Sequence, residues 1–173
     1  SDRLLAASAE EEDFVTDMVR VALADGAASR GLFGLVHDAL RPVMLHGAGR
    51  ALNLPGALAA RVKARVSRAQ GQLGEVERLL REAKARQGGS DLASAFINAA
   101  LARACYERDA LEDAADLAAE ALPHLEGSVF QDALIDVFLV AIRVAASAGQ
   151  GDRAASLIDR AELLAFRRDW APD

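Results

Sequence analysis

The stretch LARACYERDALEDAADLAAEALPHLE, residues 101–126, decides the fold of this chain. Small and large apolar residues recur in it every three or four positions, as they do on one face of an α-helix. The recurrence breaks at Arg108–Ala110 and then starts again. Two amphipathic helices joined by so short a break run antiparallel, so the stretch predicts a helical hairpin.

The second helix of this hairpin has two further copies in the chain. The three copies are GQLGEVERLLREA (71–83), DALEDAADLAAEA (109–121) and GQGDRAASLIDRA (149–161). In each, a small residue is followed three positions later by Leu79, Leu117 or Leu157, and four positions after that by alanine. Self-similarity with spacings of 38 and 40 residues indicates a helical repeat.

A further helix is predicted before each copy, from PGALAARVKARVSRAQ, DLASAFINAALARACYER and SVFQDALIDVFLVAIRVAASA. Pro55 suits a first helical turn, and Ser128 with Gln131 has the spacing of a capping box. Gly71 and Gly149 mark tight turns between paired helices. We therefore predict three hairpins, at residues 55–87, 90–126 and 128–168, each with an apolar face that a neighbour covers.

Residues 1–54 are predicted to form a degenerate leading repeat. Ser8 and Glu11 have capping-box spacing ahead of an apolar stripe, which predicts a helix start at Ser8. A second helix is expected to bend or stop near Pro42, followed by a short helix within 43–53. The whole chain, residues 1–173, is thus predicted to be a single all-α domain: an α-α superhelix of stacked antiparallel helical hairpins, tetratricopeptide-like. Since the sequence lacks an initiator methionine, we expect a fragment of a larger protein.

Composition narrows the class of protein. A net charge of −6 argues against nucleic-acid binding by this domain. The single cysteine, Cys105, excludes an intramolecular disulfide and favours a reducing, cytoplasmic compartment; we expect it to be buried in a packed helix. No apolar run approaches the roughly 18 residues of a membrane span. The three histidines lack metal-site spacing and no acid, base and nucleophile cluster together, so neither a metal, a cofactor nor an enzyme is expected.

The stretch from Arg103 to Pro172 resembles the superhelical region of MalT-like regulators, the large LuxR-type bacterial transcription activators. The resemblance is carried by ACYERDALEDAADLAAEALP, VFLVAIRVAASAGQGDRAASLIDRAELLA and RRDWAP. It implies a sensor region that receives an inducer or a regulatory protein and controls self-association. In that family the region lies between a nucleotide-binding module and a helix-turn-helix that binds DNA, and neither module is found in this sequence.

Three arginines, Arg65, Arg103 and Arg143, occupy one column of the aligned first helices. Two interpretations remain open. The column lines the concave side of the superhelix and holds an anionic ligand, or each arginine braces its repeat by pairing with a carboxylate such as Glu107. The only tyrosine, Tyr106, is a further candidate for binding.

Residues 50–86 form a basic segment with nine basic and three acidic side chains. Arg61 and Arg68 share a helix face with Arg65 in this segment. Either the segment docks an acidic partner, or it is an ordinary solvated helix face.

We expect a non-catalytic regulatory and protein- or ligand-binding module of a LuxR-type regulator, with a protein partner or small-molecule inducer. The alternative is a free-standing tetratricopeptide-like adaptor.

Overall fold

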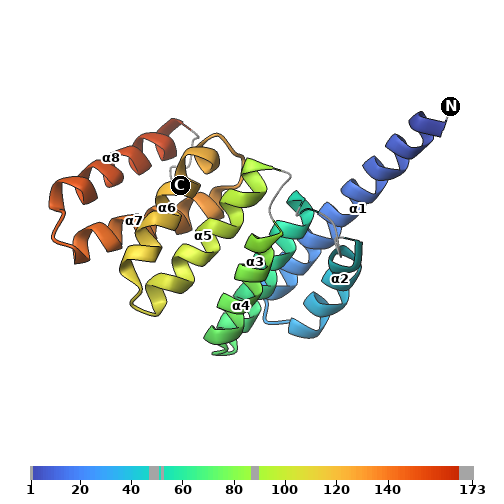
Figure 1. Cartoon of the computed structure of the whole chain (residues 1–173), viewed down its shortest axis with the longest axis horizontal. Coiled ribbons are helices and arrows are strands. Elements are labelled where there is room, and N and C mark those ends of the chain that lie inside the picture. Colours follow the sequence, from blue (N-terminus) through green and yellow to red (C-terminus); the bar gives the residue numbers. More distant parts are fainter. Residues whose placement is uncertain (1, 47–50, 52, 87–89, 168–173) are drawn as a thin grey trace. The chain divides into compact units, whose positions relative to one another are not determined.

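The computed structural model describes residues 2–46, 51, 53–86 and 90–167. Within these residues it contains eight α-helices and no β-strand, which confirms the predicted all-α class. Consecutive helices pair as antiparallel hairpins (Figure 1). In chain order the helices are α1 (Asp2–Ser29), α2 (Phe33–His46), α3 (Leu54–Ala69), α4 (Leu73–Ala85), α5 (Asp91–Glu107), α6 (Leu111–Glu126), α7 (Gln131–Ser147) and α8 (Gly151–Arg167).

The chain divides into two compact units, residues 1–93 and 94–173. In the first unit α3 packs against α1, α2 and α4. In the second unit α7 packs against α6 and α8, and Phe96 of α5 meets Phe130 edge to face, with ring centroids 4.8 Å apart. In each unit a first helix, α3 or α7, therefore packs against its own partner helix and against the preceding hairpin. The assignment of residues 1–173 to a single domain stays a prediction.

The turns inside the four hairpins share one backbone conformation. Each contains a residue with φ between 63° and 74°: Gly31, Gly71, Asp109 and Gly149. The next residue donates its backbone N–H to a carbonyl five positions earlier, as Gln72 does to Ser67 at 2.9 Å, which closes a Schellman turn. These turn residues are spaced by 40, 38 and 40 positions. The hairpin of α1 and α2 therefore keeps the register of the three hairpins that follow it.

The column of leucines that was predicted to face inward does so to different degrees. Leu79 is buried, and Leu117 and Leu157 are half-buried. The small residues three positions before them are buried in all three copies, and Cys105 is buried as predicted.

The predicted start of the first helix at Ser8 is wrong. Helix α1 begins at Asp2, so Ser8 lies inside the helix. Residues 2–12 contain leucine, alanine and glutamate, which favour helix, and neither glycine nor proline interrupts them. Capping-box spacing alone therefore misplaced the boundary.

The second helix does not stop near Pro42, and the alternative prediction of a bend there stays a prediction. Helix α2 contains Pro42 and continues to His46. Val43, directly after the proline, is buried, and this packing holds the last turn in helical form despite the lost backbone donor. Of the short helix predicted within 43–53, residues 43–46 belong to α2 and residues 51 and 53 are not helical; residues 47–50 and 52 lie outside the described residues.

The start of α3 confirms one predicted signal, and the start of α7 contradicts another. Pro55 lies in the first turn of α3, where the Asn53 side chain accepts a hydrogen bond from the Gly56 N–H at 2.9 Å. Helix α7 has Phe130 at its N-cap and no side-chain cap. The hydroxyl of Ser128 donates to the Leu125 carbonyl at 2.8 Å and accepts from the Phe130 N–H at 3.3 Å. It therefore joins the end of α6 to the residue before α7 and does not form the predicted capping box.

Candidate functional site

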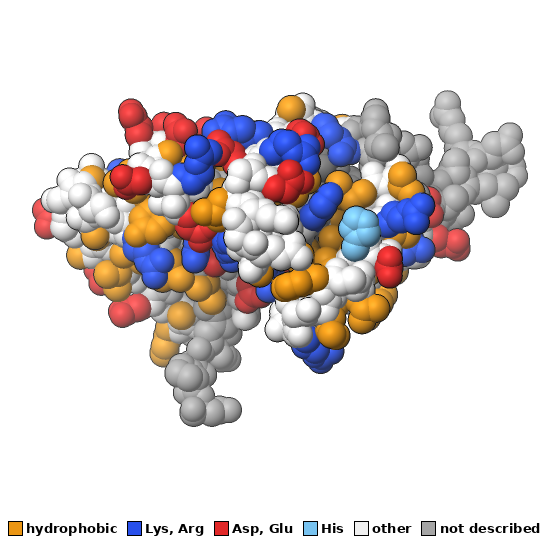
Figure 2. All heavy atoms as spheres, turned by 90° about the horizontal axis from the view of Figure 1, so that it is seen from below, with side chains coloured by type: hydrophobic (Ala, Val, Ile, Leu, Met, Phe, Trp, Pro, Cys, Tyr) orange, Lys and Arg blue, Asp and Glu red, His pale blue; other side chains and the backbone are white. Residues whose placement is uncertain are grey.

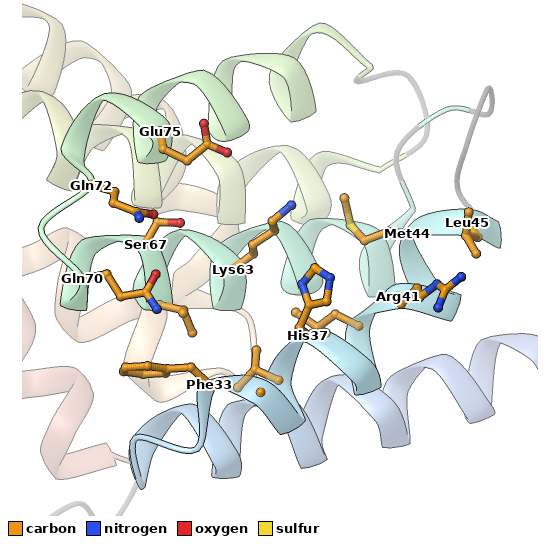
Figure 3. A pocket seen from close by; sticks show the side chains of 14 residues that line it. Phe33, His37, Arg41, Met44, Leu45, Lys63, Ser67, Gln70, Gln72 and Glu75 are labelled. Atoms are coloured by element: carbon orange, nitrogen blue, oxygen red, sulfur yellow. The ribbon is translucent and has the colours of Figure 1, made fainter.

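In the part of the chain that the structure describes, each unit has a groove that lies between the second helices of two hairpins and has a first helix as its floor. Groove 1, of about 640 Å³, lies between α2 and the start of α4 over α3 (Figure 3). Groove 2, of about 500 Å³, lies between α6 and α8 over α7. Both form where a second helix cannot fully cover the first helix beneath it.

The two grooves are lined by equivalent positions of the repeat. All residues that line groove 1, apart from Val36 and Leu40, have a counterpart 78 residues later in the lining of groove 2. The same spacing separates Gly31 from Asp109 in the hairpin turns. The grooves can therefore be compared position by position within one chain.

The comparison separates side chains that the fold needs from side chains that it does not. Groove 1 presents His37, Arg41, Lys63, Ser67 and Gln70 at the positions where groove 2 has Ala115, Ala119, Ala141, Ala145 and Ala148. Because the hairpins of the second unit form the same groove with alanine, the fold does not require these polar groups. A few polar groups placed over an apolar lining are typical of a ligand site.

Groove 1 combines an apolar base with basic groups. Figure 3 shows the side chains of His37 and Lys63 extending into the groove from α2 and α3, with Phe33 and Met44 along the α2 side. Lys63 is half-buried. Within the described residues, no hydrogen bond or ion pair holds its ammonium group. This cation is therefore available to a ligand.

Among the described residues that line groove 1, the one acidic side chain is already bound to a cation. The carboxylate of Glu75 accepts hydrogen bonds from Arg78 at 2.6 and 2.8 Å. These hydrogen bonds hold the pKa of Glu75 below its usual value, and the charge of Lys63 lowers that pKa further. Arg78 also pairs with Glu82 and so offsets only part of the charge of Glu75. The other charged groups of the described lining, Arg41 and Lys63, are basic, and groove 1 therefore favours an anion.

The arginine column predicted from the sequence makes mostly internal contacts. Arg65 pairs with Asp25 of α1 and donates to the Ser29 hydroxyl at 3.3 Å. Arg103 donates to Glu107 at 2.7 Å and lies 3.8 Å from Asp136. Arg143 is exposed, and no hydrogen bond or ion pair joins it to the described residues. The contacts of Arg65 and Arg103 correspond to the bracing interpretation; ligand binding by this column stays a prediction.

The other candidates from the sequence lie elsewhere on the helices. Arg61 and Arg68 are half-buried on α3, and Tyr106 is half-buried near the end of α5. None of these residues, nor any of the arginine column, lines groove 1. Sequence reasoning missed His37 and Lys63. The signal that would have found them is the 78-residue register, which becomes visible once Gly31 is aligned with Asp109.

Two further features bear on the class of protein. Among the described residues, no group of three or more histidine, cysteine, aspartate or glutamate side chains is arranged to hold a metal ion. In the same part of the chain, every helix is too short or too polar to cross a membrane.

No family model matches the sequence, and comparisons with curated proteins and with solved structures find no significant match.

Proposed function

We propose that this protein is a non-catalytic regulatory module that binds a small anionic ligand in groove 1. The observation that carries the proposal is the replacement of alanine by polar side chains in groove 1 but not in groove 2. Such side chains cost rotamer entropy wherever they are held in place. A role in binding explains why one groove has them and its counterpart does without them.

The size and chemistry of groove 1 indicate the kind of ligand. Its volume of about 640 Å³ falls within the range of roughly 300–1,000 Å³ of small-molecule sites. The apolar side chains of Phe33 and Met44 suit a hydrocarbon or aromatic part, while Lys63 suits a carboxylate, sulfonate or phosphate group. The ligand class that fits is an organic anion with an apolar body.

The resemblance of residues 103–172 to MalT-like regulators supplies the wider proposal. A region of that kind receives an inducer and controls self-association in a cytoplasmic transcription regulator, while a separate helix-turn-helix binds DNA. A groove for an organic anion supports the proposal that this region receives an inducer.

The gene sequence on both sides of this region tests whether it belongs to such a regulator. A nucleotide-binding motif upstream and a helix-turn-helix downstream support the regulator, whereas a free-standing gene favours the adaptor.

Groove 1 can be tested with 8-anilinonaphthalene-1-sulfonate, a fluorescent organic anion with aromatic rings. We expect saturable binding to the native protein. The variant Lys63→Ala should raise the dissociation constant roughly tenfold, since a hydrogen bond to a charged group contributes about 1.5 kcal/mol or more. Circular dichroism would confirm that Lys63→Ala keeps the helical fold.

The matched control removes a cation from the other groove. Arg153 lines groove 2 at the position equivalent to Glu75, and Arg153→Ala is expected to leave the dissociation constant unchanged. An equal loss of affinity in both variants, or a loss in Arg153→Ala alone, would overturn the assignment of the ligand to groove 1.

A further inference from the structure

The polar side chains of groove 1 separate into two groups along the groove. Figure 2 shows basic, acidic and hydrophobic side chains intermingled on the face that it presents, so charge alone does not mark a site there. In groove 1 the order of the residues adds information. Helices α2 and α3 pack against each other and run antiparallel (Figure 3), so the start of α2 lies beside the end of α3.

The first group, the ring end, consists of Phe33, Ser67 and Gln70. Phe33 is the first residue of α2, Ser67 is buried near the end of α3, and Gln70 is the C-cap of α3. They offer an aromatic face, a hydroxyl group and a carboxamide, none of which carries a charge. At the equivalent positions groove 2 has Leu111, Ala145 and Ala148. The ring end therefore provides aromatic and hydrogen-bonding chemistry that the repeat does not require.

The second group, the cation end, consists of His37, Arg41 and Lys63. Arg41 follows His37 by one turn on the groove-lining face of α2, and Lys63 extends into the groove from α3. Arg41 lies about two turns beyond Phe33, and Lys63 lies about two turns before the C-cap of α3, which places these two cations roughly 10–12 Å from the ring end. Groove 1 therefore has charge at one end and neutral hydrogen-bonding groups at the other.

The cation end matches a doubly charged group better than a singly charged one. Arg41 and Lys63 supply two positive charges, and the imidazole of His37 has at least one N–H donor in either protonation state. A phosphate monoester carries nearly two negative charges near neutral pH and has three acceptor oxygens, whereas a carboxylate has one charge and two oxygens. Glu75 projects from α4 on the other side of the groove (Figure 3), so its charge directs a phosphate towards α2.

The ring end matches a flat heteroaromatic group. Aromatic rings stack on the face of a side chain such as Phe33, and the carboxamide of Gln70 both donates and accepts hydrogen bonds, as the edge of such a ring does. We propose that groove 1 binds a heteroaromatic phosphate monoester, the chemistry of a nucleoside monophosphate, with its ring at the ring end and its phosphate at the cation end. In such a ligand a pentose holds the ring and the phosphate apart, as the two ends require. The inference rests on the proposed function of groove 1 and adds the class of ligand.

Isothermal titration calorimetry of the full chain with adenosine monophosphate tests the inference. The nucleotide should bind roughly tenfold or more tightly than adenosine or inorganic phosphate, because only the intact nucleotide reaches both ends of groove 1. Lys63→Ala should raise the dissociation constant of the nucleotide roughly tenfold and leave that of adenosine unchanged, since adenosine lacks the phosphate.

Two variants test the ring end without disturbing the fold. Phe33→Leu and Gln70→Ala each introduce the residue that groove 2 has at the equivalent position, and circular dichroism should confirm that both keep the helical fold. Each should raise the dissociation constant of the nucleotide roughly fivefold, since each removes one ring contact or one hydrogen bond to a neutral group. Binding of adenosine should weaken by the same factor, because both ligands use the ring end.

Gln150→Ala is the matched control. Gln150 lines groove 2 at the position equivalent to Gln72, so this variant removes a carboxamide from the other groove and should leave the dissociation constant of the nucleotide unchanged. An equal loss of affinity in Gln150→Ala, an unchanged affinity in Gln70→Ala, or a nucleotide that binds no more tightly than inorganic phosphate would each overturn the inference.

The fluorescent sulfonate separates failure of this inference from failure of the proposed function. If 8-anilinonaphthalene-1-sulfonate binds in a manner that depends on Lys63, while adenosine monophosphate neither binds nor displaces it, the class of ligand is wrong and groove 1 remains a site for an organic anion. If neither ligand binds, the proposed function fails as well.

Discussion

At the scale of single residues, the hairpin turns show how one backbone position sets the repeat. Three of the four hairpin turns have glycine in the left-handed conformation. The remaining turn, between α5 and α6, has Asp109 there, with φ 63°. Aspartate tolerates this region better than most side chains, but its Cβ still meets the following carbonyl. Asp109 is therefore a site where the chain retains avoidable strain.

Replacing this aspartate should stabilise the protein. We expect Asp109→Gly to raise the free energy of unfolding by about 0.5–1 kcal/mol, because the relief of strain exceeds the greater chain entropy of glycine. Urea unfolding followed by circular dichroism measures the change. Gly149→Asp, the reverse exchange at the equivalent position, should lower the stability by a similar amount; a less stable Asp109→Gly would contradict the argument.

A second residue-scale prediction concerns the pKa of Glu75. Its hydrogen bonds from Arg78 hold the pKa below the ordinary value of 4.5, so the folded protein binds this proton more weakly than the unfolded chain. The stabilising contribution is therefore present above pH 4.5 and is lost as the pH falls through the lowered pKa. Since the pair is exposed, the effect is small and is reduced by salt.

Titration of the Glu75 carboxyl carbon by NMR measures this directly. In Arg78→Gln the pKa of Glu75 should move back up towards its ordinary value. Arg81→Gln is the control, because Arg81 donates to Glu77 and not to Glu75, and it should leave that pKa in place. An unchanged pKa in Arg78→Gln would show that the hydrogen bonds do not cause the shift.

At the scale of elements, the sequence predicted the helices from α3 onward because glycine and proline punctuate them. The leading hairpin was harder to recognise, since Ala39 occupies the position of Leu79 and Val43 that of Ala83. The larger side chain of this pair is therefore at the second position instead of the first. The leucine pattern disappears from the sequence, although the two side chains together still fill the space between the helices. The positive φ of Gly31, which the turns of the later hairpins share, aligns the leading hairpin with them where the side chains do not.

Groove 1 could not be predicted from the sequence, for a related reason. His37 and Lys63 look like ordinary surface residues until the register shows which positions line a groove. The arginine column attracted attention instead because identical residues align there. Yet Arg65 and Arg103 make internal ion pairs, so two of the three recurring arginines contribute to the packing of their repeats. The residues that differ between repeats are the better indicators of a specific site.

The core of α5 provides a prediction at this scale. Phe96 is fully buried and packs edge to face against Phe130. Phe96→Ala should lower the free energy of unfolding by about 3–5 kcal/mol, through lost burial and the cavity that remains. Phe166→Ala, at a side chain that is 83% exposed, should change it by less than about 0.5 kcal/mol. Similar losses in both variants would contradict this description of the core.

At the scale of the whole molecule, the division into two compact units predicts how the protein unfolds. Repeat proteins have stability that is a sum of local terms and nearest-neighbour interfaces, and regions of one protein open with different free energies. A change in one hairpin therefore acts most strongly on the elements that contact it.

Hydrogen exchange with mass spectrometry tests this expectation in the variant Phe96→Leu, a milder change than truncation to alanine. Exchange should become faster in α5 and α6, joined by the hydrogen bond from Asn98 to Glu120 at 3.0 Å, and in the first turns of α7, which follow Phe130. Exchange in α1 and α2 should stay as in the native protein. An equal acceleration in all helices would mean that the chain opens only as a whole, and the stability of each hairpin would then not be a local property.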